Sequence, residues 1–319
     1  MATVRTGARL HIGFQNLSLA HERLYGGVGV ALEEPRVVLT AHRADTIDAD
    51  PVVQTATERA VSLLGVSGAR VRLRRALPRH VGLGSGTQHA LATFGAIARA
   101  YEIDAPVREH APVLGRGGRS GVGVGTFETG GFVVDTGHPT ELFTTAPPEP
   151  GEWTVPSILA RYSLPENWRF VLVIPAGITG EHGEREDRQM RSVVERADPT
   201  IGAELAVVLT HQLLPAVAEE NIEQFGRAID TVGRLNGAWY ADEQGGVYRP
   251  PAGDLIERLR DASAVTGVGQ SSWGPVVYGL TDSDRIDAAR TAATDALAAI
   301  DTDGEVLVSK PRNHGARYE

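Results

Sequence analysis

Apolar and polar residues alternate along the first segment of the chain. Over residues 4–14 the polar positions include Arg5, Arg9 and His11, and this period-two pattern predicts a half-buried strand. Side chains two residues apart share one face of a strand, so Arg9 and His11 should face the same surroundings. A solvated strand face is the commoner reason for such a pair, and a binding site is the other.

Strand and helix patterns continue through the rest of the first half. Strands are predicted over residues 26–32, 36–41, 69–77 and 132–134, and helices over 54–64, 85–101 and 104–114. A proline-dense stretch, TTAPPEPGEWTVP at residues 144–156, has the composition of an inter-domain linker. We therefore expect a mixed N-terminal domain over residues 1–150.

The second half shows a regular order of elements. We predict a strand at 169–174, helices within 186–234, strands at 264–268 and 275–280, a helix at 282–300 and a strand at 305–308. The order β-α-β-β-α-β is that of ferredoxin-like domains, so residues 151–319 should form one. Residues 203–218 are apolar enough to be buried on most sides. The expected fold class is α+β.

A glycine-rich turn, HVGLGSGTQ, lies between the strand at 69–77 and the helix that follows it. Its glycines lack the Cβ atoms that would keep a bulky anion away, and the unpaired N–H groups of the helix's first turn point into the space they clear. The turn therefore predicts a phosphate-binding loop made of Gly82, Leu83, Gly84, Ser85, Gly86, Thr87 and Gln88.

The start of that helix has a second signal, because Ser85 and Gln88 have the spacing of a capping box. The glycine pattern itself is not decisive. GxGxG matches neither the dinucleotide fingerprint nor the lysine-containing P-loop. A turn that only caps a helix and binds nothing would look the same.

Two further glycine-rich segments could contribute to binding. The first, GRGGRSGVGVGTFETGG at residues 115–131, carries Arg116, Arg119, Ser120 and Glu128, and it could wrap an anion or simply be mobile. The second, GVGQSSWGPVVYG at residues 267–279, offers hydrogen-bonding or covering side chains at Gln270, Ser271, Ser272 and Trp273. A polar hairpin turn is its simplest explanation. Three such elements in one chain favour binding more than any one does.

Composition narrows the class of protein. The net charge of −9 argues against nucleic-acid binding, which needs a basic surface. The absence of cysteine excludes disulfides and thiolate chemistry. No signal peptide and no stretch long and apolar enough for a membrane span is expected, so the protein should be cytoplasmic. Lys310 is the only lysine, whereas arginines suited to phosphate are plentiful.

A charge-dense segment, residues 181–188, includes Glu181, His182, Glu186 and Asp187. Metal ligation there is conceivable. However, no pair has the HExxH spacing, and a run of charges is usually solvated.

The motifs resemble the GHMP superfamily, named for galactokinase, homoserine kinase, mevalonate kinase and phosphomevalonate kinase. GARLHIGF corresponds to its first motif, GLGSGTQ to its phosphate loop and GVGQSSWG to its late glycine turn. The resemblance implies two domains, the first like domain 2 of ribosomal protein S5 and the second ferredoxin-like. It also suggests a homodimer.

Within that superfamily the sequence motifs are most similar to those of the β-ribofuranosylaminobenzene 5′-phosphate synthase family. RLHIGF, HVGLGSGTQHALA, GRGGRSGVGVGTFETGGFVVD and GQSSWGP carry this resemblance. It implies that 5-phosphoribosyl diphosphate is joined to a 4-substituted benzoate, 4-aminobenzoate or 4-hydroxybenzoate, with loss of pyrophosphate and CO₂, as in methanopterin biosynthesis. Because losing CO₂ restores the aromatic ring, no base is needed.

The resemblance also assigns roles to residues. It implies catalytic roles for Arg9, His11 and Arg23, and substrate contacts from Asn16, Arg116, Arg119, Ser120, Gln270, Ser271, Ser272 and Trp273. It further implies a divalent metal, Mg²⁺ or Mn²⁺, near Ser85 and Glu128. In the family an Asp often stands near Asn16 and another near Tyr25, and both positions are changed here.

One departure from the kinases weakens a kinase hypothesis. Kinases of the superfamily place a catalytic Asp in a Ser-Gly-Val-Asp segment, whereas Ser120, Gly121 and Val122 are followed here by Gly123. Glu128 would have to replace that carboxylate. An ATP-dependent small-molecule kinase is therefore the second hypothesis, and a binding protein without catalysis is the third.

Overall fold

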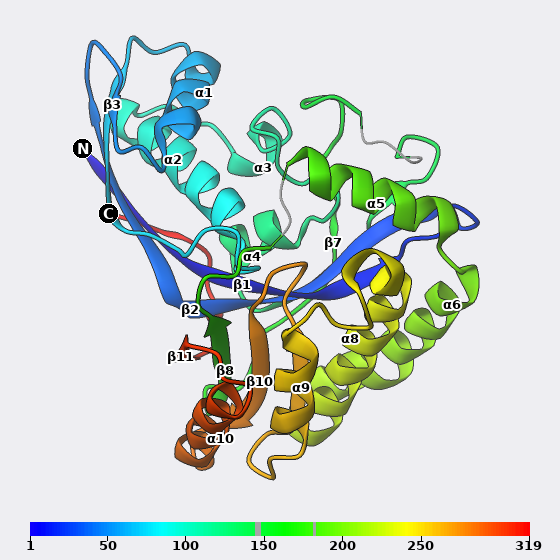
Figure 1. Ribbon diagram of the computed structural model, residues 1–319. Coiled ribbons are helices and arrows are strands. Elements are labelled where there is room, and N and C mark those ends of the chain that lie inside the picture. The colour runs from blue at the N-terminus through cyan, green and yellow to red at the C-terminus, as the bar shows by residue number, and fades with distance from the viewer. Residues whose placement is uncertain (144–147, 181–182) are drawn as a thin grey trace.

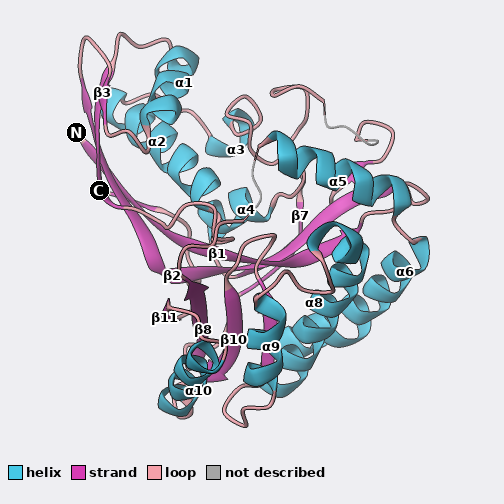
Figure 2. Cartoon of the chain, viewed as in Figure 1, coloured by secondary structure: helices cyan, strands magenta, loops and turns pink. Residues whose placement is uncertain are grey.

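The computed structural model describes residues 1–143, 148–180 and 183–319. Two sheets organise it (Figures 1 and 2). The larger contains β1 (Ala2–Asn16), β2 (Arg23–Arg43), β3 (Asp48–Ala49), β4 (Ala69–Arg75), β5 (Phe132–Asp135), β6 (His138–Pro139), β7 (Ile158–Tyr162) and β12 (Arg317–Tyr318). Its main path is β12-β1-β2-β4-β3, and β5 pairs with both β2 and β7.

The long antiparallel pair β1 and β2 is the frame of the larger sheet. The strands predicted at 26–32 and 36–41 are in fact one strand, since β2 runs without a break through Pro35. The separation expected at Glu34 and Pro35 is therefore wrong. On its partner β1, register shifts between Gly7 and Arg9 and between His11 and Gly13 re-aim the side chains of the predicted cationic face.

Four helices accompany this sheet: α1 (Gln54–Leu64), α2 (Ser85–Tyr101), α3 (Val107–His110) and α4 (Val122–Thr129). The helix α2 packs on β1 and β2 and also contacts α1 and α4. Its apolar side chains Leu91, Phe94 and Ile97 are fully buried, and burying each contributes roughly 2 kcal/mol. The phosphate loop is thus anchored to the best-packed helix of this half.

The glycine-rich segment 115–131 is more ordered than its composition suggested. It contains the buried helix α4, in which Gly123 and Gly125 allow close packing rather than mobility. A Cβ on Gly123 would lie 3.0 Å from Cγ2 of Thr87, and one on Gly125 would lie 3.1 Å from Cγ1 of Val133. The prediction of a loop was wrong for these residues because glycine content does not distinguish tight packing from freedom.

The smaller sheet has the strand order β11-β8-β10-β9, and all its neighbours are antiparallel. It comprises β8 (Trp168–Pro175), β9 (Gly267–Gln270), β10 (Val277–Asp282) and β11 (Gly304–Ser309). With α9 (Ala252–Arg260) and α10 (Ile286–Ala299) it forms a second apolar core. This confirms the predicted ferredoxin-like arrangement.

The helices between β8 and α9 are α5 (Glu184–Arg196), α6 (Pro199–Val208), a π-helical turn (Leu209–Leu213), α7 (Leu214–Ala218) and α8 (Ile222–Gln244). The helix α8 contacts both β1 and β9, so it joins the two halves.

The stretch Pro199–Ala218 corrects two expectations. By length and composition it could cross a membrane, although none was expected to, and only 39% of its most apolar window is buried in the fold. Its buried side chains include Leu205 and Leu213, whereas Val207 is 54% exposed. The stretch is therefore a packed helix with an apolar outer face, not a helix buried on most sides.

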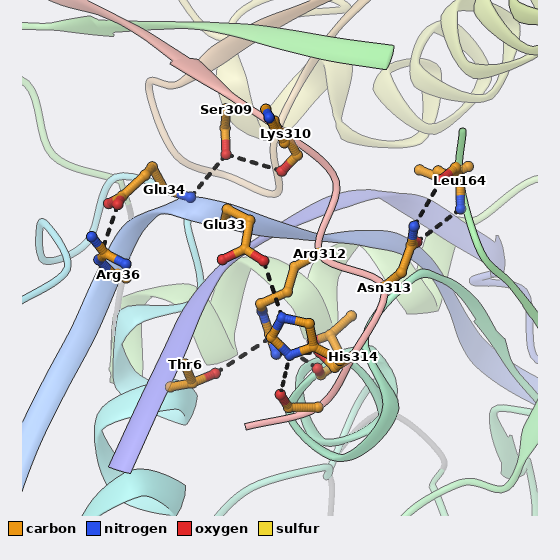
Figure 3. Close-up of polar contacts among 12 residues, drawn as sticks. Thr6, Glu33, Glu34, Arg36, Leu164, Ser309, Lys310, Arg312, Asn313 and His314 are labelled. Atoms are coloured by element: carbon orange, nitrogen blue, oxygen red, sulfur yellow. Dashed lines mark hydrogen bonds and ion pairs between the residues drawn. The ribbon is translucent and has the colours of Figure 1, made fainter. Parts of the chain in front are cut away.

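The C-terminal segment returns to the larger sheet, where β12 pairs with β1 and the two termini lie together (Figure 1). Since β7 also pairs with β5, the two sheets do not divide the chain at residue 150. Figure 3 shows the buried Arg312 reaching Thr6. Thr6 in turn donates to Gln88 at 2.7 Å. The last residues therefore support the helix that carries the phosphate loop.

Candidate active site

The phosphate loop is held by its own glycines and by two distant segments. Gly82 and Gly84 have φ of 98° and 76°, which favour glycine. The carbonyl of Gly82 accepts from Nη1 of Arg9 at 2.9 Å and from Oγ of Ser271 at 2.8 Å. The backbone N–H of Arg9 donates to the Leu83 carbonyl at 3.1 Å. The first strand and the late glycine turn thus meet at this loop.

The helix start differs from the predicted capping box. Gly84 is the N-cap, and no side chain caps the helix. The N–H of Gln88 donates to the Gly84 carbonyl at 3.0 Å, and its side chain donates to the Gly123 carbonyl at 2.9 Å. Gln88 is therefore a structural residue, and the N–H groups of Ser85, Gly86 and Thr87 precede the first intrahelical bond.

A cavity of about 460 Å³ lies over these N–H groups. Two arginines flank the loop there. A Cβ on Gly84 would lie 2.8 Å from Cγ of Arg9, and one on Gly86 would lie 3.2 Å from Nη1 of Arg116. At Gly84 only glycine leaves room for the Arg9 side chain, whereas a Cβ at Gly86 would require only a small shift of the Arg116 guanidinium. The result is a ring of N–H and guanidinium donors suited to a phosphate.

A second, narrower cavity of about 60 Å³ adjoins the first. Both cavities are lined by Glu186, Ser272 and Trp273, which therefore mark their junction. The second is lined in addition by His11, Ile12, Gly13, Phe14, Arg119, Met190, Gly233, Asn236, Gly237, Tyr240, Gln244, Val247, Tyr248 and Gln270. A cavity that holds benzene measures about 150 Å³, so an aromatic ring can enter only if a side chain such as Met190 or Trp273 moves.

His11 and Arg9 occupy unusual electrostatic surroundings. Burial, reinforced by the neighbouring Arg9, lowers the pKa of His11 to about 3. Burial also lowers the pKa of Arg9 to about 10. At neutral pH the imidazole is therefore neutral and the guanidinium is charged. Among the described residues no group bonds to Nε2 of His11, which leaves that atom available to a ligand.

An ion-pair network places a carboxylate at the junction. Nη1 of Arg119 donates to Oε1 of Glu186 at 2.7 Å, and Arg119 also pairs with Asp187. The charged run in the sequence predicted a solvated segment, whereas the packing of α5 brings Glu186 to both cavities. Glu181 and His182, also considered as metal ligands, lie outside the described residues.

Several of the predicted substrate contacts make hydrogen bonds within the protein. Ser271 is fully buried and accepts from the N–H of His11 at 3.1 Å while donating to Gly82. Ser120 donates to Asp135 at 3.0 Å and lines neither cavity. Gln270 lines the second cavity, but its amide oxygen accepts from the N–H of Arg249 at 3.0 Å.

Arg23, Asn16 and Glu128 are not brought to these cavities. Arg23 donates to the Thr136 carbonyl at 3.0 Å, and Asn16 donates to the Arg23 carbonyl at 2.8 Å. Both line a separate cavity near the end of the β1–β2 hairpin. Glu128 pairs with Arg108 at 2.7 Å. The two joined cavities therefore give no support to the catalytic role for Arg23, the substrate contact for Asn16 or the metal role for Glu128, which stay predictions from the sequence.

Within the described residues, no side chain takes the place of the kinase Asp beside the loop, and no lysine lines the phosphate cavity. Gly123 packs against Thr87, so the position of the kinase Asp carries no side chain. Glu128 does not line either cavity and therefore does not replace it. The single lysine, Lys310, is exposed on the C-terminal segment shown in Figure 3. Among the described residues that line the phosphate cavity there is thus no lysine, and the one carboxylate, Glu186, comes from α5 rather than from the position of the kinase Asp.

The fold and the loop define a member of the GHMP kinase class. The chain matches the GHMP kinases N terminal domain over residues 51–131 and the GHMP kinases C terminal domain over residues 213–299. Homoserine kinase from Cytophaga hutchinsonii has the same fold, with a TM-score of 0.71, 16% identity and coverage of 100% of this chain and 97% of that one. Mevalonate kinase from L. major gives a TM-score of 0.70 at 12% identity, covering 98% and 96% of the two chains.

Sequence similarity is stronger to a different activity within that class. The β-ribofuranosylphenol 5′-phosphate synthase of Archaeoglobus fulgidus is 33% identical over 327 residues, covering 100% of both chains. That of Methanothermobacter thermautotrophicus is 31% identical, covering 98% of this chain and 97% of its own. The chain belongs to the β-ribofuranosylphenol 5′-phosphate synthase family. The resemblance read from the motifs is thereby confirmed.

Proposed function

We propose that this chain joins 5-phosphoribosyl diphosphate to a 4-substituted benzoate and releases pyrophosphate and CO₂. The name of its relatives points to 4-hydroxybenzoate as the acceptor, with 4-aminobenzoate as the alternative, and to a place in methanopterin biosynthesis. The observation that carries the proposal is the pair of joined cavities. One presents N–H groups and arginines to a diphosphate, and the other offers an aromatic-lined space beside it.

The reaction balances without a protein base. A bond forms between the acceptor's carboxylate-bearing ring carbon and C1 of the ribose, while the bond from C1 to the diphosphate oxygen breaks and its electrons leave with pyrophosphate. The bond from the ring to the carboxylate then breaks, its electron pair restores aromaticity, and CO₂ departs. The missing kinase Asp at Gly123 is therefore no obstacle.

Each part of the site has a task in this scheme. The N–H groups at the start of α2, together with Arg9 and Arg116, bind the diphosphate and stabilise its charge as it leaves. Glu186, which lines both cavities, stabilises the sugar as it becomes cationic. Neutral His11 positions the acceptor by a hydrogen bond from Nε2. Trp273 closes the acceptor cavity and excludes water.

We further propose that Mg²⁺ or Mn²⁺ enters with the diphosphate. The described residues contain no group of three or more His, Asp or Glu able to hold a metal ion, but Mg²⁺ is commonly bound through substrate phosphates, water and few protein oxygens. The hydroxyl of Ser85 lines the phosphate cavity and fits this role. When bound, the ion would add positive charge beside the leaving group.

Incubation of the protein with Mg²⁺, the ribosyl diphosphate and carboxyl-labelled 4-hydroxybenzoate tests the proposal. Labelled CO₂ and pyrophosphate should be released in equal amounts, and only when both substrates are present. No release from this acceptor or from 4-aminobenzoate, by folded protein, would contradict it. Tight binding without turnover would instead indicate a binding protein.

The kinase hypothesis is not favoured, and ligand stabilisation separates it from the transferase. The ribosyl diphosphate should raise the melting temperature. Stabilisation by ATP alone would favour a kinase. A cytoplasmic location, a homodimer, and the absence of nucleic-acid and membrane partners belong to the same proposal, and size-exclusion chromatography with light scattering tests the dimer.

A further inference from the structure

The phosphate cavity carries more positive charge than a single diphosphate requires. Besides Arg9, it is lined by Arg59 of α1, by Arg79 of the segment before the phosphate loop, and by Arg116 of the segment after α3. These three come from separate parts of the sequence. The only carboxylate-bearing residue among the described residues lining the cavity is Glu186.

Arg59 and Arg116 lie close enough to repel each other, and Arg79 and Arg116 both act on the neighbouring His89. Arg59 contributes to lowering the pKa of Arg116, although burial is the larger cause. Burial, with smaller contributions from Arg79 and Arg116, lowers the pKa of His89 to about 4. His89 lines the same cavity. Like charges held together without an anion destabilise the protein, so an anion bound among them would relieve the repulsion.

Within the described part of the chain, none of the three arginines forms an ion pair. The side chain of Arg59 has one weak contact, from Nη1 to the Leu114 carbonyl at 3.5 Å. Nε of Arg116 is buried and has no hydrogen-bond partner there. By contrast, the exposed Arg70 and Arg72 on β4 both pair with Asp48. The donors facing the cavity are thus unused, whereas those of Arg70 and Arg72 outside it are neutralised by Asp48.

We propose that Arg59, Arg79 and Arg116 form a second anion subsite, which binds the 5-phosphate of the ribosyl diphosphate. This inference rests on the proposed function. The substrate carries phosphate at both ends of one sugar, and the cavity has two sets of donors to match. The loop N–H groups and Arg9 receive the diphosphate, and Arg59 and Arg79 receive the 5-phosphate, with Arg116 between them. Forked guanidinium groups suit a terminal phosphate.

Competition between two partial ligands tests the subsite. Ribose 5-phosphate carries only the 5-phosphate, and inorganic pyrophosphate carries only the diphosphate. Both should inhibit the wild-type enzyme competitively against the ribosyl diphosphate. Arg79→Gln and Arg59→Gln should each raise the inhibition constant of ribose 5-phosphate about tenfold, as expected for losing one charge-assisted contact. The constant for pyrophosphate should change less than about threefold.

Arg74→Gln is the matched control, because Arg74 is an exposed arginine on β4 that does not line the cavity. It should leave both inhibition constants unchanged. Equal weakening of both ligands by the Arg79 and Arg59 variants, or of neither, would overturn the subsite while leaving the transferase in place.

Calorimetric binding of ribose 5-phosphate and pyrophosphate repeats the test without turnover. If the wild-type protein releases no CO₂, the proposed function fails, yet selective loss of ribose 5-phosphate binding in the variants would still support the subsite. Failure of the wild-type protein to bind ribose 5-phosphate would contradict the subsite directly.

Discussion

The substitution Gly84→Ala should show how much the contact with Arg9 contributes to stability and catalysis. A matched glycine substitution elsewhere accounts for the cost of the backbone conformation alone. Gly84 has φ of 76°, and a Cβ there would meet Cγ of Arg9 at 2.8 Å. Cγ lies near the root of the side chain, so the whole guanidinium must swing away. Gly65 is the matched control. Its φ is 64°, but a Cβ there meets nothing within 4 Å.

The two substitutions should lower the free energy of unfolding by different amounts, and the difference should equal the contribution of the Arg9 contact. Gly65→Ala carries only the left-handed backbone cost, about 1 kcal/mol. Gly84→Ala carries the same cost plus the bond from Arg9 to the Gly82 carbonyl, a charge-assisted bond worth about 2 kcal/mol. The expected total is therefore about 3 kcal/mol. At roughly 2 °C per kcal/mol for a chain of this size, the melting temperatures should fall by about 2 °C and about 6 °C.

Steady-state kinetics supply the second measurement. Because Arg9 is displaced, Gly84→Ala should lower kcat/KM for the ribosyl diphosphate at least about tenfold, whereas Gly65→Ala should leave it unchanged. In an Arg9→Ala background the additional stability cost of Gly84→Ala should vanish, since the clashing atoms are gone. Equal effects of the two glycine substitutions on stability and on kcat/KM would refute the reasoning.

Four further predictions concern charge and support. The folded protein has a lowered pKa at His11, so at acid pH the unfolded chain binds a proton that the folded protein does not. The free energy of unfolding should therefore fall as pH drops from about 6.5 toward 3, by up to about 1.4 kcal/mol per pH unit. Urea unfolding of His11→Gln should show a weaker dependence of that free energy on pH between 4.5 and 6.5. Glu186→Gln should lower kcat about tenfold or more, because the cationic sugar loses a stabilising carboxylate. It should not raise KM for the ribosyl diphosphate, because a negative charge is removed from the phosphate cavity, and a raised KM would contradict this. Ser85→Ala should raise the Mg²⁺ concentration needed for half-maximal rate severalfold, and Glu128→Gln should not. Arg312→Met should lower the melting temperature by several degrees, since Thr6 and the Thr126 carbonyl lose a buried donor, and an unchanged temperature would show that this network does not support α2.

The sequence allowed the elements with strong local periodicity to be predicted. The first strand, the helix after the phosphate loop and the ferredoxin-like strand order each follow from patterns within a few residues, and all are present. Glycine-rich α4 was missed because its glycines serve contacts with Thr87 and Val133 that only the fold creates. The break expected at Pro35 failed because a strand can continue through proline where no ladder hydrogen bond is required of it.

The residues of the candidate site also differ in whether local sequence patterns could predict them. Arg9 and the loop glycines could be found from sequence, because the motif that contains them is local. The sequence could not show that Arg23 differs from these residues, because its donors are used by backbone carbonyls that follow β5 only in the folded chain. The place of Glu186 at the cavities could not be predicted either, because a carboxylate in a charged run acquires its position only when α5 packs beside them.

A phosphate loop of the GHMP type fixes where an anion binds, and it does not fix which bond breaks. In a kinase the acceptor hydroxyl must be oriented or deprotonated, so a carboxylate beside the loop is needed. Here that position is Gly123, whose lack of a side chain lets α4 pack against Thr87 and the loop helix. An acceptor that loses CO₂ gives up its own electron pair to the ring, so the same loop can serve glycosyl transfer once the base is gone. The loss of the carboxylate and the change of leaving group are then two aspects of one change in chemistry.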